Sequence, residues 1–184
     1  KATQVLPRED PTAAAIVQQQ MASDGVHFEF SSEIIKLEQT KREKVVVIRR
    51  GGESVRVAGD AILVAAGRAP NVGGMGLEKA GVTFDERRGV EVNDRLQTSN
   101  RSIYAAGDVA SRFKFTHAAD FMARIVIGNS LFMGRSKASR LLIPWATYTT
   151  PEIAHVGVGH QEVAQNPDRY TTLTIKMSEV DRAI

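Results

Sequence analysis

The stretch TSNRSIYAAGDV, residues 98–109, places a glycine and an aspartate at the end of a short apolar run. Aspartate commonly leaves a strand and caps the next element, so the pair alone is weak evidence of a functional site. The alternative is a ligand site, because ligands of open α/β sheets bind beyond the carboxyl ends of the strands. At such a place Gly107 would allow close approach and Asp108 would accept hydrogen bonds from sugar-like hydroxyls. The surrounding sequence has to decide between the two interpretations.

The composition is that of a soluble globular protein. The chain has 184 residues, of which 42% are hydrophobic and 24% charged, and its formal net charge is +3. The basic residues are scattered, and the densest group, Arg135, Lys137 and Arg140, has no aromatic neighbours for base stacking. We therefore expect a solvated loop there and no nucleic-acid partner.

The residue types also limit the chemistry. The chain has no cysteine, which rules out a disulfide, a thiolate metal site and a thiol nucleophile within it. Its four histidines have no metal-ligand spacing with nearby carboxylates, so no metal site is predicted. The longest apolar run, Ala61–Ala66, is far too short to span a membrane, and the first residues lack the form of a signal peptide. We expect a cytoplasmic protein with no membrane partner.

The first third of the chain predicts one helix and several strands. Asp10 and Pro11 begin a helix that ends near Gly25, because Asp caps free N–H groups and Pro fits the first helical position. Strand composition follows, with turns between strands. The predicted strands are Val26–Phe30, Glu33–Thr40, Lys44–Arg50, Ser54–Ala58 and Ala61–Ala66, the last of them as a strand buried in a parallel sheet.

The remainder predicts a long helix and further short strands. Thr116 is expected to cap a helix over residues 117–133, which would bury one apolar face. That face comprises Ala118, Phe121, Met122, Ile125, Val126 and Phe132. Further strands are expected at Val90–Asn93, Ile103–Ala106, Ile143–Thr149, Ala154–Val158 and Tyr170–Met177, with a short helix at Gln161–Gln165.

Three sequence blocks together give the chain a family resemblance. They are AAGRAPN at residues 65–71, TSNRSIYAAGDV at residues 98–109 and YTTPEIAHVG at residues 148–157. In this order and spacing they resemble the class I pyridine nucleotide-disulfide oxidoreductases, which include dihydrolipoamide dehydrogenases and mercuric reductases. The resemblance implies an α/β fold: part of a Rossmann-like arrangement of two dinucleotide-binding domains, for FAD and NAD(P), followed by the start of an α+β dimerisation domain.

The resemblance also implies domain boundaries and cofactor ligands. Residues 1–68 match the C-terminal part of the NAD(P)-binding domain, residues 69–141 that of the FAD-binding domain, and residues 142–184 a truncated dimerisation domain. Asp108, beside Gly107, matches the aspartate that binds the ribityl chain of FAD.

Two other segments are implied to approach the cofactors. The helix starting near His117 matches the one whose N-terminus points at the flavin pyrimidine edge, so Thr116, His117 and Ala118 would contribute mainly backbone. His117 has a competing interpretation as an ordinary residue of a first helical turn. Gly67 and Arg68 match the turn between the two dinucleotide-binding domains, where cofactor contact and a plain turn are equally open.

Several parts that carry the chemistry in this family have no match in the chain. These are the Gly-rich turns for FAD and NAD(P)H, the redox cysteine pair, and the His-Pro and Glu of the dimerisation domain. We therefore assign no catalytic residue and expect the 184 residues alone to be inactive.

The full-length protein is expected to be a homodimer that passes hydride from NAD(P)H via flavin to a small-molecule or thiol/disulfide substrate or a thiol-bound metal ion. The alternative hypothesis is a non-catalytic scaffold or interaction module that kept the fold and lost the cofactor.

Overall fold

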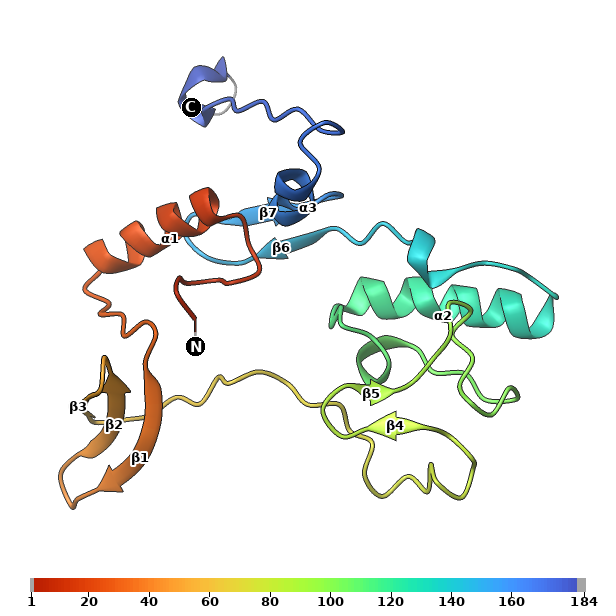
Figure 1. The fold of residues 1–184 in the computed structure, drawn as a ribbon, viewed down its shortest axis with the longest axis horizontal. Helices are drawn as coiled ribbons and strands as arrows, with labels where there is room; N and C mark the ends of the chain where they lie inside the picture. The colour runs from red at the N-terminus through yellow and green to blue at the C-terminus, as the bar shows by residue number, and fades with distance from the viewer. Residues whose placement is uncertain (1, 182–184) are drawn as a thin grey trace. The chain divides into compact units, whose positions relative to one another are not determined.

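A computed structural model describes residues 2–181, which form two compact units (Figure 1). Unit 1 combines the chain up to residue 62 with the chain from residue 146 onward, and unit 2 comprises residues 63–145. The predicted site lies in unit 2, so unit 1 is described only briefly.

Helix α1, Pro11–Ser23, begins and ends where the sequence predicts. The Asp10 carboxylate accepts hydrogen bonds from the N–H groups of Thr12 at 2.8 Å and Ala13 at 3.2 Å, and Pro11 occupies the first turn. Gly25 follows the helix with φ +90°, a conformation that favours glycine. Both end signals are local in sequence, and both are confirmed.

The predicted meander is a three-stranded antiparallel sheet in unit 1. Its strands are β1 (Glu33–Gln39), β2 (Lys44–Arg50) and β3 (Glu53–Gly59), in the order β1-β2-β3. The central strand β2 contains the buried residues Val45, Val47 and Ile48. Gly51 and Gly52 form the turn to β3, both with positive φ, as a tight hairpin requires.

The C-terminal segment of unit 1 contacts the residues that precede α1. It contains strand β6 (Trp145–Thr147) from Ala146 onward, and then β7 (Ile153–His155), α3 (His160–Gln165) and the short 3₁₀ helix η3 (Met177–Glu179). Strands β6 and β7 form a two-stranded sheet. The Thr147 hydroxyl donates a 2.7 Å hydrogen bond to the carboxylate of Glu9, which is only 6% exposed. This bond ties the segment before α1 to β6.

Unit 2 contains few regular elements and two small apolar clusters. Its elements are β4 (Phe84–Asp85), β5 (Gly89–Val90), the 3₁₀ helix η1 (Gly107–Val109), α2 (Thr116–Leu131) and the 3₁₀ helix η2 (Ala138–Arg140). One cluster is built on Val72, Val82 and Val90, and the other on Leu96, Met122 and Ile125.

The segment before η1 contributes alternately to these clusters. Ile103 and Ala105 pack on the first cluster, and Tyr104 and Ala106 on the second. This alternation is the period of two that extended backbone imposes. It fixes the direction in which the chain enters Gly107 and Asp108.

Several predicted strands do not form. Val26–Phe30, Ala61–Ala66 and Tyr170–Met177 contain no strand, Val90–Asn93 forms one only at Val90, and Ile103–Ala106 makes a single bridge, from Tyr104 to Gln97. The predicted buried strand Ala61–Ala66 is instead exposed, with Val64 at 77%. A strand exists only through hydrogen bonds to a neighbouring strand, and none of the described residues supplies one to Val26–Phe30, Ala61–Ala66 or Tyr170–Met177.

Candidate functional site

Gly107 is held in a conformation and a space that only glycine fits easily. Its φ is +77°, and the residue is buried. A Cβ atom built on it would lie 3.1 Å from the Cβ of Ala119 in α2. The glycine therefore allows η1 to pack closely on α2.

Gly89 supports the same turn from the other side, and sequence reasoning missed it. Its φ is +96°, and a Cβ atom there would overlap the backbone carbonyl oxygen of Val109 in η1. The hairpin that presents Gly89 is closed by Asp85, whose carboxylate accepts the N–H groups of Arg88 at 2.7 Å and Arg87 at 2.9 Å. These bonds lower the pKa of Asp85, the N–H of Arg88 most. The one signal in the sequence is a glycine directly before a predicted strand.

Asp108 presents its carboxylate outward from this turn. The residue is exposed, and its side chain makes no hydrogen bond or ion pair with any residue in the described range 2–181. Its backbone carbonyl accepts a 2.7 Å hydrogen bond from the Lys114 ammonium group, a contact that the sequence did not suggest. The backbone is thus fixed while the carboxylate stays available to an external hydroxyl donor.

The N-terminus of α2 has no side-chain cap. The N-cap residue is Phe115, with an extended backbone, and the first turn contains no acidic residue. The prediction that Thr116 caps the helix is wrong, because Thr116 is already its first residue. Thr116 is exposed, His117 half-buried and Ala118 buried. Free N–H groups at an uncapped first turn attract electron-rich groups.

The face of α2 differs from the prediction at its far end. Ala118, Met122 and Ile125 are buried as expected, but Phe132 is 75% exposed. The helix ends at Leu131, and Phe132 leaves it with φ −119°, so its side chain does not continue the helical face.

His117 belongs to a group of aromatic side chains that we call the aromatic array: Phe113, Phe115, His117 and Trp145. The His117 ring stacks on Phe115 with centroids 5.5 Å apart, and Phe115 stacks on Trp145 at 6.4 Å. His117 Nε2 lies 2.7 Å from the backbone oxygen of Pro144.

Gly67 and Arg68 are not brought to this turn by any hydrogen bond among the described residues. Both are exposed, and Gly67 has φ +103°. A Cβ on Gly67 would meet nothing within 4 Å, so its conformation alone explains the glycine. Gly107, Asp108 and the first turn of α2 do lie together.

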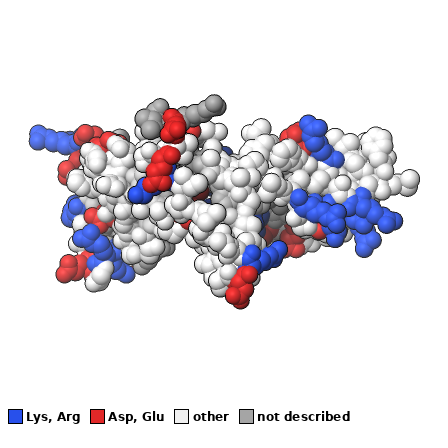
Figure 2. Space-filling view, turned by 90° about the horizontal axis from the view of Figure 1, so that it is seen from above, with Lys and Arg blue, Asp and Glu red and all other residues white. Residues whose placement is uncertain are grey.

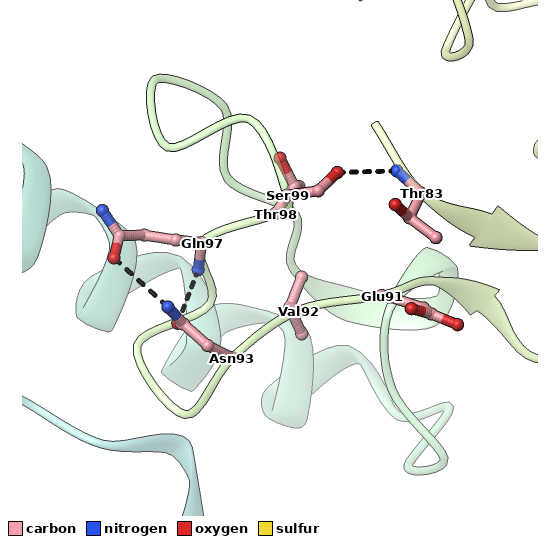
Figure 3. A pocket seen from close by; sticks show the side chains of 7 residues that line it. All are labelled: Thr83, Glu91, Val92, Asn93, Gln97, Thr98 and Ser99. Carbon is pink, nitrogen blue, oxygen red and sulfur yellow. Dashed lines mark hydrogen bonds between the residues drawn. The ribbon is translucent and has the colours of Figure 1, made fainter. Parts of the chain in front are cut away.

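A polar hollow of about 320 Å³ lies elsewhere in unit 2 and contains none of the predicted site residues (Figure 3). It is lined by Thr83, Glu91, Val92, Asn93, Gln97, Thr98 and Ser99. Ser99 accepts the Thr83 N–H at 2.8 Å, and the Asn93 amide exchanges hydrogen bonds with Gln97. Several lining groups are therefore engaged in hydrogen bonds of the protein itself, and we assign no ligand to the hollow.

Charge is mixed on the face that Figure 2 shows. Figure 2 shows groups of Lys and Arg side chains with acidic side chains beside them. Arg135, Lys137 and Arg140 are exposed, as expected for a solvated segment, and Lys137 lies 3.8 Å from Asp94. Residues 2–181 contain no group of three or more His, Cys, Asp or Glu side chains that could hold a metal ion. In the same range no helix has the length and apolar character needed to cross a bilayer.

Comparison with known proteins gives the context of this geometry. Residues 1–123 match the family model described as pyridine nucleotide-disulphide oxidoreductase. Mercuric reductase of Staphylococcus aureus is 31% identical over 175 residues, which cover 95% of this chain and 32% of that protein. Dihydrolipoyl dehydrogenase of Bacillus subtilis is 34% identical over 162 residues, or 88% of this chain and 34% of that protein. The chain thus spans about a third of the length of these curated relatives.

Solved structures agree with the family match. The Cu(II) complex of the HOCl-induced flavoprotein disulfide reductase RclA from Escherichia coli superposes with a TM-score of 0.76 at 27% identity, over 89% of this chain and 37% of that one. LpdA from Mycobacterium tuberculosis superposes with a TM-score of 0.78 at 28% identity, over 89% and 35%. The predicted α/β fold of FAD- and NAD(P)-binding disulfide oxidoreductases is confirmed.

Proposed function

Because the chain belongs to the pyridine nucleotide-disulphide oxidoreductase family, we propose that it is part of an enzyme that passes hydride from NAD(P)H via FAD to a disulfide or a thiol-bound metal ion. Enzymes of this family use FAD and NAD(P)H. Relatives carry the names mercuric reductase and dihydrolipoyl dehydrogenase, which correspond to these two substrate classes.

The observation that supports FAD binding by this chain is the exposed carboxylate of Asp108. This carboxylate lies on a turn that Gly107 and Gly89 allow to pack tightly. No side chain among the described residues forms a hydrogen bond or ion pair with it. A carboxylate held in this way accepts hydrogen bonds from the hydroxyls of a ribityl chain. The uncapped first turn of α2, at Thr116, His117 and Ala118, suits the electron-rich edge of a flavin ring.

FAD, when bound, supplies the two-electron chemistry, which no side chain of this chain provides. In our proposal the chain's own residues bind and orient it: Asp108 through its carboxylate, and the first turn of α2 through backbone N–H groups. Contact of Gly67 and Arg68 with a cofactor stays a prediction. The chain contains no cysteine, so we propose that the reactive thiols come from a part of the protein outside these 184 residues.

The remaining features of the proposal concern the whole protein. We propose that residues 1–68, 69–141 and 142–184 are parts of the NAD(P)-binding, FAD-binding and dimerisation domains, and that the last supports a homodimer. We further propose a cytoplasmic location. The names of the relatives support this assignment only at the level of the family.

Replacement of Asp108 tests the site. We expect Asp108→Ala, in the full-length protein, to weaken FAD binding by about 10- to 100-fold, since a hydrogen bond to a charged group contributes about 1.5–3 kcal/mol. Its unfolding midpoint without FAD should not change, because the carboxylate makes no hydrogen bond to the described residues. Asp168→Ala, at an exposed aspartate of unit 1, is the matched control. Titration of the apoprotein with FAD, followed by flavin fluorescence, measures both, and an unchanged affinity for Asp108→Ala would refute the assignment.

A further inference from the structure

The aromatic array joins the first turn of α2 to Trp145, the last residue of unit 2. The His117 and Phe115 rings are nearly parallel, with an interplanar angle of 10°, and Phe115 and Trp145 meet at 9°. The Phe121 and His117 rings meet in a T-shaped arrangement, with their centroids 6.0 Å apart. The imidazole is therefore packed between aromatic rings and does not behave as a free surface side chain.

The hydrogen bond of this ring has a fixed direction. A backbone carbonyl only accepts, so the 2.7 Å contact with Pro144 requires the proton on His117 Nε2. The neutral ring must then be the Nε2–H tautomer, with its lone pair on Nδ1. Pro144 itself has no N–H, so its carbonyl is the one backbone group that it can offer to a partner.

These contacts hold two residues on either side of Thr116, the first residue of α2. Phe115 is the N-cap residue and His117 is the second residue of the helix, and neither the N-cap side chain nor an acidic residue stabilises this end. A helix end without a side-chain cap frays readily. The stack on Phe115 and the bond from His117 to Pro144 hold this end of the helix in place of a side-chain cap.

We propose that His117 is a positioning residue for FAD: its Nε2–H bond to Pro144 fixes the first turn of α2 in the orientation that binds the flavin. This inference rests on the proposed FAD site. It adds a side-chain role for His117 to the backbone role expected from the sequence. It also explains why this histidine is held at both its ring face and its nitrogen.

The tautomer provides a test that does not depend on flavin. In protein labelled with ¹⁵N-histidine, the His117 signals are assigned by their loss in His117→Gln. We expect the neutral ring to show the coupling pattern of the Nε2–H tautomer. A neutral ring protonated on Nδ1 would overturn the proposal, because such a ring cannot donate to Pro144.

A matched pair of variants tests the positioning role. His117→Gln keeps an N–H group near the place of Nε2 but loses the ring, whereas His117→Phe keeps a stacking ring but loses the donor. We expect His117→Phe to weaken FAD binding by the full-length protein about 2- to 12-fold, the effect of one neutral hydrogen bond, and His117→Gln to stay within about twofold of wild type. His155→Phe is the control, since His155 Nε2 contacts the carbonyl of Gly157 in unit 1 at 3.1 Å.

The outcomes separate the proposal from the function on which it rests. Equal FAD affinity of His117→Phe and wild type would overturn the positioning role, and so would equal losses in His117→Phe and His117→Gln. Failure of the wild-type protein itself to bind FAD would overturn the proposed function and the inference with it. That failure is recognised without any variant.

Discussion

Gly89 offers the sharpest test of how the Asp108 turn is built. Three glycines of unit 2 allow a stepwise comparison, because they differ first in backbone φ and then in the space around the Cα atom. Gly73 has neither positive φ nor a close neighbour, Gly74 has φ +74° with nothing within 4 Å, and Gly89 has φ +96° with the carbonyl of Val109 in the way. Replacement of each by Ala changes the unfolded chain equally, so differences between the variants report the folded state.

The expected losses of unfolding free energy follow from this comparison. Gly73→Ala should change it by less than about 1 kcal/mol. Gly74→Ala should lose about 1–2 kcal/mol from left-handed backbone strain alone. Gly89→Ala should lose that amount plus about 1–3 kcal/mol, because the new methyl group must displace backbone. Urea unfolding followed by Trp145, the one tryptophan of the sequence, measures all three.

The same variants connect stability to the site. Because Val109 shares η1 with Asp108, Gly89→Ala should weaken FAD binding more than Gly74→Ala does. If Gly89→Ala were no less stable than Gly74→Ala, the packing of Gly89 on η1 would not exist as described. Equal FAD affinity of the two variants would show that the packing of Gly89 on η1 does not support FAD binding.

Two further predictions concern the other contacts. Thr147→Val removes the hydroxyl that bonds to the buried Glu9 carboxylate, so it should lower the free energy of unfolding in urea by about 1–3 kcal/mol. Thr147→Ser keeps the hydroxyl and should stay near wild type. Equal stability of the two variants would contradict this prediction. The Ser139 N–H, and then its hydroxyl, lower the pKa of Asp94 from its usual 3.8. A lowered folded-state pKa gives stability that is fully present above pH 3.8 and is lost as the pH falls through the lowered value. Asp94→Asn should therefore make the unfolding free energy less dependent on pH below about pH 4, and an unchanged slope in urea unfolding between pH 4 and pH 2 would refute the contribution of Asp94.

The sequence predicted those elements whose signals are local. Asp10 and Gly25 bound α1 because capping and left-handed termination involve neighbouring residues. The antiparallel meander was predictable because each of its strands finds its partner one turn away in sequence. The strand predicted for Ala61–Ala66 failed for the opposite reason: a parallel strand needs partners that lie far away in sequence, and none of the described residues supplies one.

The candidate site was predictable in its residue types and not in its supports. Gly107 and Asp108 stand out because a glycine and an acid follow an apolar run. The roles of Gly89, Lys114 and Pro144 depend on contacts that only the folded chain creates. Such contacts leave no periodicity and no motif in the sequence.

The contacts that hold the turn in place do not involve the Asp108 carboxylate, the group that would bind a ligand. Gly107 packs on α2, the Val109 carbonyl faces Gly89, and the Asp108 carbonyl is held by Lys114. Within the turn these contacts involve only backbone atoms and glycine, so none of them uses the Asp108 carboxylate. A ligand that binds this carboxylate binds a turn that is already ordered. The binding free energy therefore includes no cost for ordering the turn. For this reason loss of the Asp108 carboxylate should weaken binding without unfolding, whereas loss of Gly89 should affect both.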